Sequence, residues 1–392
     1  MKKNLVLLLQ IAIALLTRLF FRALYIYPIK KNRVLFQAFR EKQYACNPKY
    51  ISEKLKKQYG NEIEIGWTFR NPEKFSFLSD QGIRVMKAGT FEAYKFALTA
   101  KVVCVNTYYK PTLPRRKGQY FIRTWHGGGA YKRVGKMQKM PRLERYYLSL
   151  QQEGADLYLS SSLAFTQMTL QDSFGYFGDT LDKGMPRNDI LIRGADESEI
   201  LRIRRDVGLA DGQRLALYAP TYRSDIKPHA FGIDYNRISR ALEKRFGGSW
   251  VFGYRGHHIT HRESHRESAS GAINLTDYPD MQELLLAAGV LITDYSSSIW
   301  DMSLTKKPAL LYATDLKDYS AERDFYTDIR SWPFPLSENN DELEKNILEF
   351  DDNKYLKDVQ SHHKALGSYE TGRAAEYAAK RIYEICTGGS TT

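Results

Sequence analysis

The chain has 392 residues, of which 43% are hydrophobic and 26% charged, and its formal net charge is +13 at pH 7. This composition excludes a largely disordered protein, and the length suits two domains of ordinary size. The positive charge favours an anionic partner, which could be nucleic acid, a nucleotide-activated substrate or an acidic membrane surface. Three widely spaced cysteines, Cys46, Cys104 and Cys386, argue against a disulfide framework or a CxxC metal site and favour a reducing compartment.

The first 28 residues are predicted to form a membrane-associating helix. The uninterrupted apolar run, residues 5–16, is shorter than the roughly 20 residues that span a bilayer, and no small-residue cleavage site follows it. Basic and aromatic side chains come next, as in a helix that lies in a membrane interface: Arg18, Phe20, Phe21 and Arg22. We expect a monotopic, peripheral helix on the cytoplasmic face of the cell membrane; a spanning anchor and a buried helix are the alternatives.

Short apolar runs then alternate with amphipathic stretches, a pattern typical of parallel βαβ units. The predicted strands of the first series are 34–36, 63–67, 102–105, 120–122 and 157–159, with helical patterns such as 48–59 and 91–100 between them. A second series, beyond a charged segment at 196–206, predicts strands at 215–218, 250–254, 290–292 and 309–312. The two series predict two Rossmann-like, doubly wound α/β domains that face a cleft, with boundaries 29–200 and 201–386, followed by a flexible tail at 387–392.

Polar residues follow the predicted strands, at the edge where ligands of open α/β sheets bind. After the strand at 120–122 come Trp125, His126, a glycine run at 127–129 and Lys132. The glycines permit close approach of the backbone to a ligand, His126 titrates near neutral pH, and Lys132 adds positive charge. A flexible turn with an incidental histidine is the alternative.

Two further turns carry groups that can donate to phosphates. Arg187, in the turn 184–189, could hold a phosphate with two parallel hydrogen bonds or act as a structural cap between the halves. After the strand at 215–218, Thr221 and Arg223 can donate to phosphates, and Tyr222 could lie against a base.

A strand-end arginine and histidine, Arg255 and His257, can neutralise the charge that develops on a phosphoryl group. Further histidines at 258, 261 and 265 match no regular metal template, so no metal site is predicted.

The stretch 291–301 predicts a strand that delivers a loop and a helix N-terminus to an anionic phosphate. Asp294 and the serines 296–298 form the polar cluster, and Asp301 follows close enough to reach a ribose hydroxyl. An ordinary N-cap is the alternative.

Other templates fail, because the chain has no Gly-x-Ser-x-Gly elbow, no P-loop and no dinucleotide fingerprint. The dispersed positive charge predicts no nucleic-acid partner.

In combination, these segments resemble the CDP-glycerol glycerophosphotransferase family, the teichoic acid primases and polymerases. The resemblance rests on Thr124 to Gly135, Gly184 to Asp189, Tyr218 to Arg223, Arg255 with His257, Ile292 to Pro308, and Arg323 to Asp328. Two departures from the family pattern, the glycine run at 127–129 and Asp324, leave the alcohol of the donor open.

The resemblance implies a glycosyltransferase-B fold, whose C-terminal domain holds CDP-glycerol and whose N-terminal domain admits the acceptor. It implies no required cofactor and leaves metal dependence and oligomeric state open. Lys132 is expected to contact the acceptor or a phosphate. The predicted donor-binding residues are Trp125, Gly127, Gly128, Arg187, Thr221, Tyr222, Arg223, Arg255, Asp294, Ser296, Ser297, Ser298, Asp301 and Arg323.

The implied reaction is phosphoryl transfer, in which an acceptor hydroxyl attacks the phosphorus that bears the glycerol and CMP leaves. His126 is the expected general base, while His257 and Arg255 are expected to stabilise charge on the pyrophosphate. The implied acceptor is a polyprenyl-linked saccharide or teichoic acid chain at an anionic membrane surface, and the single module favours a primase over a polymerase. Alternatives are a CDP-ribitol enzyme, a nucleotide-sugar glycosyltransferase of the same fold and a non-catalytic membrane-bound binding module.

Overall fold

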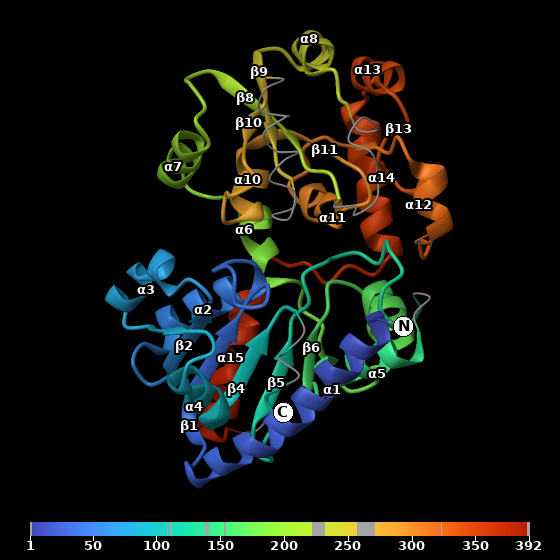
Figure 1. Cartoon of the computed structure of the whole chain (residues 1–392). Coiled ribbons are helices and arrows are strands. Elements are labelled where there is room, and N and C mark those ends of the chain that lie inside the picture. The colour runs from blue at the N-terminus through green and yellow to red at the C-terminus, as the bar shows by residue number, and fades with distance from the viewer. Residues whose placement is uncertain are drawn as a thin grey trace.

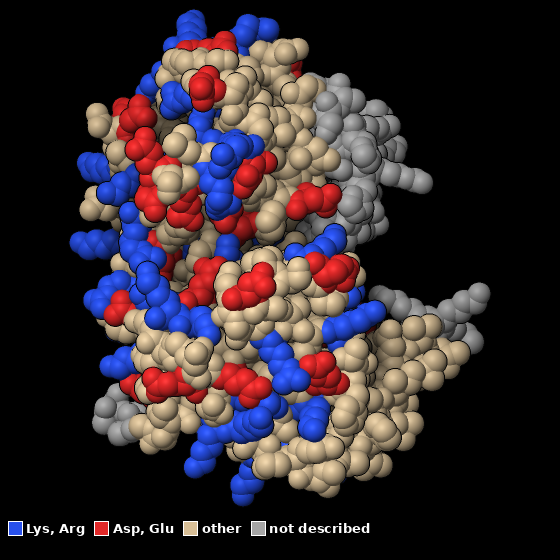
Figure 2. All heavy atoms as spheres, turned by 90° about the vertical axis from the view of Figure 1, so that its left-hand side faces the viewer, with Lys and Arg blue, Asp and Glu red and all other residues tan. Residues whose placement is uncertain are grey.

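The computed structural model describes residues 2–107, 109, 112–137, 141–152, 154–221, 232–256, 271–322 and 324–389. Two parallel β-sheets organise these residues into two lobes, one above the other in Figure 1. Figure 2 shows lysines and arginines interspersed with acidic side chains over both lobes, so this face carries no single basic stripe.

The N-terminal lobe contains a seven-stranded sheet in the order β3-β2-β1-β4-β5-β6-β7, and its pairings are parallel. The strand order reverses between β1 and β4, which is the switch point where open α/β sheets bind ligands. The strands are β1 (Lys30–Gln37), β2 (Glu64–Phe69), β3 (Arg84–Lys87), β4 (Ala100–Val105), β5 (Tyr120–Arg123), β6 (Leu157–Leu159) and β7 (Asp179–Leu181).

The C-terminal lobe repeats this topology with six parallel strands in the order β10-β9-β8-β11-β12-β13. Its switch point lies between β8 and β11. The strands are β8 (Gln213–Tyr218), β9 (Ser249–Tyr254), β10 (Ile273–Asn274), β11 (Ala288–Thr293), β12 (Ala309–Tyr312) and β13 (Leu336–Ser337).

Helices cover both faces of each sheet, which is why the central strands contain continuous apolar runs rather than an alternating pattern. Leu35 of β1 packs with the cluster that contains Phe96 of α4, whereas Phe36 packs on the other face with Leu55 of α2. The α-helices are α1 (Lys2–Phe21), α2 (Cys46–Tyr59), α3 (Phe77–Asp80), α4 (Phe91–Thr99), α5 (Arg142–Gln152), α6 (Asp189–Arg193), α7 (Glu197–Val207), α8 (Tyr235–Phe246), α10 (Met281–Ala287), α11 (Ser298–Ser303), α12 (Leu316–Glu322), α13 (Asn340–Leu348), α14 (Asp352–Ala365) and α15 (Ala374–Thr387). Short 3₁₀ helices are η1 (Arg22–Ile26), η2 (Pro72–Phe75), η3 (Gly135–Met137), η5 (Pro186–Asn188) and η7 (Ile329–Ser331), and η4 (Phe165–Ser173) is a π-helix.

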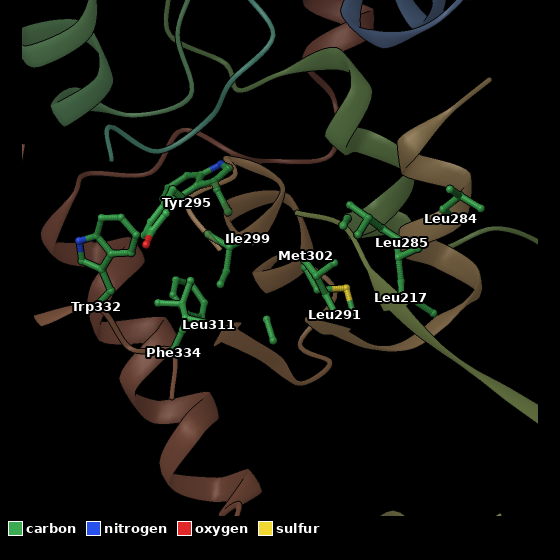
Figure 3. Close-up of a cluster of buried hydrophobic side chains, with 14 of the residues drawn as sticks. Leu217, Leu284, Leu285, Leu291, Tyr295, Ile299, Met302, Leu311, Trp332 and Phe334 are labelled. Carbon is green, nitrogen blue, oxygen red and sulfur yellow. The ribbon is translucent and has the colours of Figure 1, made fainter. Parts of the chain in front are cut away.

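The core of the C-terminal lobe fixes the short helix α11 against its sheet. Figure 3 shows Ile299 and Met302 of α11 among the side chains of Leu291 and Leu311 from the strands below. Because these residues are fully buried, the loop that precedes α11 has a fixed position.

Two parallel α/β domains were predicted, and the structure confirms them, together with all nine predicted strands. The four strands that were not predicted, β3, β7, β10 and β13, have two to four residues each and lie toward the sheet edges. The helix α15, assigned to the C-terminal domain at 201–386, instead packs on the N-terminal lobe, where Ala378, Ala379 and Ile382 enter the core. Figure 1 shows α15 in red beside the blue α2.

The helix α1 lies along the N-terminal lobe and exposes most of its apolar surface. Leu7, Ile11, Ala14 and Phe21 are buried, and the exposed apolar residues are Leu5, Val6, Leu8, Leu9, Ile13, Leu15, Leu16, Leu19 and Phe20. Phe21, predicted to face the membrane, contacts Tyr94 instead, with ring centroids 4.5 Å apart.

The basic residues of this segment differ in their surroundings. Arg18 donates to the carbonyl of Leu150 at 3.0 Å, whereas Arg22 is exposed. By length and composition, Asn4–Ile26 is also apolar enough to cross a membrane. The short uninterrupted run at 5–16 therefore does not exclude a spanning helix.

Candidate functional site

A cleft of about 680 Å³ lies between the two lobes. The loops that line it follow the carboxyl ends of β1, β4 and β5 in one lobe and of β8, β9 and β11 in the other. The switch points of the two sheets therefore face the same space, where parallel sheets place their ligands.

His126 lies in this cleft after β5, with its tautomer fixed by the backbone. Its Nδ1 atom is 2.9 Å from the carbonyl oxygen of Asn106, which follows β4. A carbonyl oxygen can only accept, so Nδ1 donates, and Nε2 is the basic nitrogen of the neutral ring. The ring also contacts Trp125 and Phe39, with centroid distances of 4.3 and 5.8 Å. This geometry suits a general base.

The residue before the histidine has a strained backbone. Trp125 has a φ of 55°, in the left-handed region that favours glycine. Asn47 holds this conformation, because its amide donates to the carbonyls of Thr124 and Trp125 at 3.3 and 3.2 Å. Such strain concentrates at functional sites, where the surrounding structure must stabilise it.

The glycine run is required by contact between the lobes. A Cβ on Gly128 would lie 2.3 Å from Trp300 of α11, and one on Gly129 would lie 2.6 Å from Tyr131. At Gly127 the nearest atom is Ser297 Oγ, at 3.3 Å. The sequence predicted that these glycines allow a ligand to approach the backbone. The structure shows that Gly128 leaves room for the indole ring of Trp300 in the other lobe.

The segment after the glycines is anchored in the C-terminal lobe. Tyr131 is buried in that lobe's core against Trp332, with centroids 4.4 Å apart, and its hydroxyl lies 3.0 Å from His362 Nε2. Lys132 forms a β-bridge with Phe325 and lines the cleft. The segment that carries His126 is therefore held by the N-terminal lobe at His126 and by the C-terminal lobe at Tyr131.

On the opposite wall, Asp294 positions Thr221. Both carboxylate oxygens accept from the Thr221 backbone, at 2.8 and 3.0 Å, and one accepts from its hydroxyl at 2.6 Å. Asp294 is buried, and Thr221 lines the cleft. Of these two predicted donor-binding residues, Thr221 lines the cleft, and Asp294 fixes its position by accepting from both of its hydrogen-bond donors.

Ser296, Ser297 and Ser298 line the cleft where α11 begins. The Ser296 hydroxyl oxygen accepts from the backbone N–H of Ser298 at 3.3 Å and from its hydroxyl at 3.0 Å. The predicted serine cluster is therefore an ordered turn opposite the glycine run.

Arg187 and Asp301, predicted to contact phosphate and ribose, form an ion pair with each other. Arg187 Nε and Nη2 donate to the two carboxylate oxygens at 3.1 and 2.9 Å, and both side chains are at most 4% exposed. Gln282 also donates to Asp301, at 3.0 Å. Burial lowers the pKa of Arg187, but Asp301 outweighs it and holds that pKa above its ordinary value. The pair joins the lobes, as the structural-cap alternative for Arg187 predicted.

Arg255 has an unmatched donor at the cleft. Its Nη1 atom is buried and has no hydrogen-bond partner within the described ranges. Burial lowers the pKa of Arg255 to about 10, although the neighbouring Asp280 raises it, so the guanidinium is charged at neutral pH. A buried N–H of a cation without a partner is costly, and a phosphate oxygen would satisfy it.

Four predicted site residues, Tyr222, Arg223, His257 and Arg323, lie outside the described residues, as do the histidines at 258, 261 and 265. Within the part of the chain that the structure describes, no three His, Cys, Asp or Glu side chains are grouped to hold a metal ion.

Sequence reasoning missed two groups that position residues around the cleft. Asn106 comes directly after a predicted strand, so the strand-end rule could have found it. Glu370, in the segment that leads back to α15, accepts from Met185 N, Asn188 Nδ2 and Trp300 Nε1 at 3.0, 2.9 and 3.2 Å. Burial raises the pKa of Glu370 to about 7. No local pattern in the sequence marks this residue.

The chain matches a family model over residues 19–384, described as CDP-glycerol:poly(glycerophosphate) glycerophosphotransferase. It is 28% identical to the teichoic acid poly(glycerol phosphate) polymerase of Staphylococcus epidermidis, over 91% of this chain but about half (51%) of that protein. The polymerase of Bacillus spizizenii is 24% identical, over 94% of this chain and 97% of its own length. The teichoic acid ribitol-phosphate primase of the same organism is 26% identical, over 93% and 94%.

Solved structures are similar over most of the chain. The wall teichoic acid polymerase TagF, in a histidine-to-asparagine variant soaked with CDPG, has a TM-score of 0.79 and 25% identity and covers 98% of this chain and 95% of that one.

Proposed function

The chain belongs to the CDP-glycerol:poly(glycerophosphate) glycerophosphotransferase family, a family of enzymes, and on this premise we propose its reaction. The protein transfers glycerol phosphate from CDP-glycerol to a hydroxyl group of a polyprenyl-linked saccharide or teichoic acid chain and releases CMP. Its two domains form a glycosyltransferase-B type fold.

One observation carries this proposal. The cleft sets His126, with Nδ1 donating to Asn106, opposite Thr221, the Ser296–Ser298 turn and the unmatched Nη1 of Arg255. A base on one lobe and phosphate-binding groups on the other are what transfer from a nucleotide-activated phosphate to a hydroxyl requires.

The chemistry follows from these positions. The acceptor hydroxyl oxygen attacks the phosphorus that bears the glycerol, His126 Nε2 takes the hydroxyl proton, and the bond from phosphorus to the oxygen of CMP breaks. Arg255 and the serine turn stabilise the charge on the departing CMP. Thr221 gives both its backbone N–H and its hydroxyl to Asp294, so it forms the wall beside the pyrophosphate rather than donating to it.

Membrane attachment through α1 belongs to the proposal. The exposed apolar face of α1 supports peripheral attachment to a membrane, and the proposed site of attachment is the cytoplasmic face, beside the proposed lipid-linked acceptor. Figure 2 shows mainly uncharged atoms at the lower right, toward the side of the lobe that carries α1 in Figure 1.

The direct test incubates the full chain with CDP-glycerol and a lipid-linked disaccharide and weighs the products by mass spectrometry. Release of CMP with a single added unit supports a primase, and a ladder of units supports a polymerase. The similarity to a ribitol-phosphate primase favours CDP-ribitol as the second candidate donor, so both donors are compared. Release of CDP or UDP instead would indicate a glycosyltransferase and contradict the proposal.

His126→Ala tests the assignment of the base. Because the side chain moves a proton, we expect turnover to fall by about 100-fold or more. Calorimetric titration should show that the variant still binds CDP-glycerol, since the donor groups lie on the other lobe. Unchanged turnover would remove His126 from the mechanism.

A further inference from the structure

The loop after β1 occupies the switch point of the N-terminal sheet, where the proposed reaction has so far given it no role. The residues that line the cleft here are Phe39, Arg40, Lys42, Gln43 and Ala45 of this loop, and Cys46 at the start of α2. The equivalent position in the other lobe, after β8, carries Thr221, which also lines the cleft.

The backbone of this loop is strained at three consecutive residues. Phe39, Arg40 and Glu41 have φ angles of 45°, 57° and 66°, and none is glycine. Left-handed backbone at a run of such residues persists only where the surroundings hold it.

Buried polar contacts supply that support. The Glu41 carboxylate is buried and accepts from Gln37 Nε2 at 3.2 Å and Thr68 Oγ1 at 3.1 Å. The Phe39 N–H donates to Asn106 Oδ1 at 2.8 Å, and the Arg40 N–H donates to Thr107 Oγ1 at 3.3 Å. The loop is therefore a rigid part of the cleft wall.

The supported loop carries two cations on the same wall of the cleft as the proposed base. Arg40 and Lys42 flank the buried Glu41, are exposed, and line the cleft. Within the part of the chain that the structure describes, neither side chain forms an ion pair. Asn106 links them to the reaction, because its side chain holds Phe39 while its carbonyl holds His126 Nδ1.

We infer that Arg40 and Lys42 form an anion subsite that binds a phosphate group of the acceptor, beside the hydroxyl that His126 deprotonates. The inference rests on the proposed function. The donor's phosphates have their own contacts on the opposite lobe, so two more cations on the side of the base match a second anion. That anion is the diphosphate of a lipid carrier or a phosphodiester at the end of a growing chain.

The test compares three acceptors in the full-length Arg40→Gln/Lys42→Gln variant. One carries a lipid diphosphate, one carries a glycerol phosphate unit on a neutral alkyl glycoside, and one is the same glycoside without phosphate. We expect KM to rise about tenfold or more for a phosphate-bearing acceptor, since losing charge-assisted hydrogen bonds costs that much affinity. KM for CDP-glycerol and for the neutral acceptor should change less than about twofold. The acceptor that weakens identifies which phosphate is bound.

The control variant, Lys31→Gln/Lys57→Gln, removes the same charge from exposed positions outside the cleft lining and should leave all KM values unchanged. An equal effect on all three acceptors, or a rise in the donor KM alone, overturns the subsite. Calorimetric titration with a short poly(glycerol phosphate) measures the subsite without turnover. Equal binding by wild type and variant in that titration excludes the chain phosphodiester as the bound anion, and it overturns the subsite if KM for the lipid-diphosphate acceptor is also unchanged. Absence of CMP release from wild type refutes the proposed reaction instead.

Discussion

At the scale of single residues, the interface between the lobes contains ionisable groups that are buried and fully hydrogen-bonded. Arg187 and Asp301 pair through two hydrogen bonds across the cleft, and Glu370 accepts from three donors beside them. Loss of one partner of such a pair strongly destabilises the folded protein, because the other partner is left as an uncompensated buried charge. These groups make the relative position of the lobes sensitive to single substitutions.

Asp301→Asn should lower the free energy of unfolding by about 3–5 kcal/mol, because it leaves Arg187 buried without its counter-ion. The double variant Arg187→Met/Asp301→Leu should cost less than the single change. Chemical denaturation measures both. Asp358→Asn, at the exposed pair with Lys354, is the control and should cost under about 0.5 kcal/mol. If Asp301→Asn were as mild as this control, the pair would not stabilise the interface.

Glu370 should make stability depend on pH. Burial raises its pKa from the ordinary 4.5 to about 7, so between these values the folded protein holds a proton that the unfolded chain has lost. Stability should therefore fall as pH rises from about 5 to 7 and stay low above that. Glu370→Gln should flatten this decline in thermal melts at pH 5 and 8. Glu53, whose pKa burial also raises to about 7, remains in both proteins and cancels in the comparison. Parallel slopes would contradict the assignment.

At the scale of elements, the predictable features are those that a local pattern encodes. Apolar runs revealed nine of the strands, and the rule that ligands lie beyond strand ends pointed to His126, Thr221 and the serine turn, which line the cleft. The loop at 38–46 was missed because no residue type marks left-handed backbone at Phe39, Arg40 and Glu41. The pairing of Arg187 with Asp301 was missed because it joins residues 114 positions apart.

The helix α1 shows the same limit of local patterns. The sequence predicted an apolar helix, but it did not predict which face of that helix packs on the N-terminal lobe. The triple variant Leu9→Ser/Leu16→Ser/Phe20→Ser changes only exposed positions. It should reduce co-sedimentation with anionic vesicles more than about tenfold, because each buried apolar side chain contributes about 1.5–3 kcal/mol.

The matched control for this experiment changes two leucines and a phenylalanine that are exposed elsewhere: Leu201, Leu356 and Phe91. It should sediment as wild type does. If wild type and the triple variant sediment alike, another surface binds the membrane; resistance of both to alkaline extraction would indicate a spanning helix.

At the scale of the whole molecule, the chain crosses between the lobes and returns. It leaves the N-terminal lobe near Asp189 and comes back before α15, and the two crossings are joined because Asp189 accepts from the N–H groups of Ala374 and Ala375 at 2.9 and 2.8 Å. Each lobe is therefore completed by a distant part of the chain. This connectivity has no signature in composition or periodicity, which is why the predicted boundary at 386 assigned α15 differently.

A chain that ends at residue 372 should lose the N-terminal lobe. It lacks Ala378, Ala379, Ile382 and Cys386, which fill the core between α2 and the sheet. We expect rapid proteolysis of residues 1–180 and a lower thermal midpoint by circular dichroism, because the apolar face of the sheet is uncovered. A chain that ends at residue 389 is the control. Equal midpoints for the two would show that α15 is dispensable.

The anchoring of Tyr131 in the opposite lobe has a consequence for how relatives of this protein can diverge. Five residues after His126, the chain is held in a second core, and Gly128 is pressed against Trp300 between the two anchors. The number of residues between positions 126 and 131 therefore sets the position of the imidazole ring, whichever side chains those residues carry. Insertions and deletions should be absent between positions 126 and 131 across the family, even where the side chains there have changed.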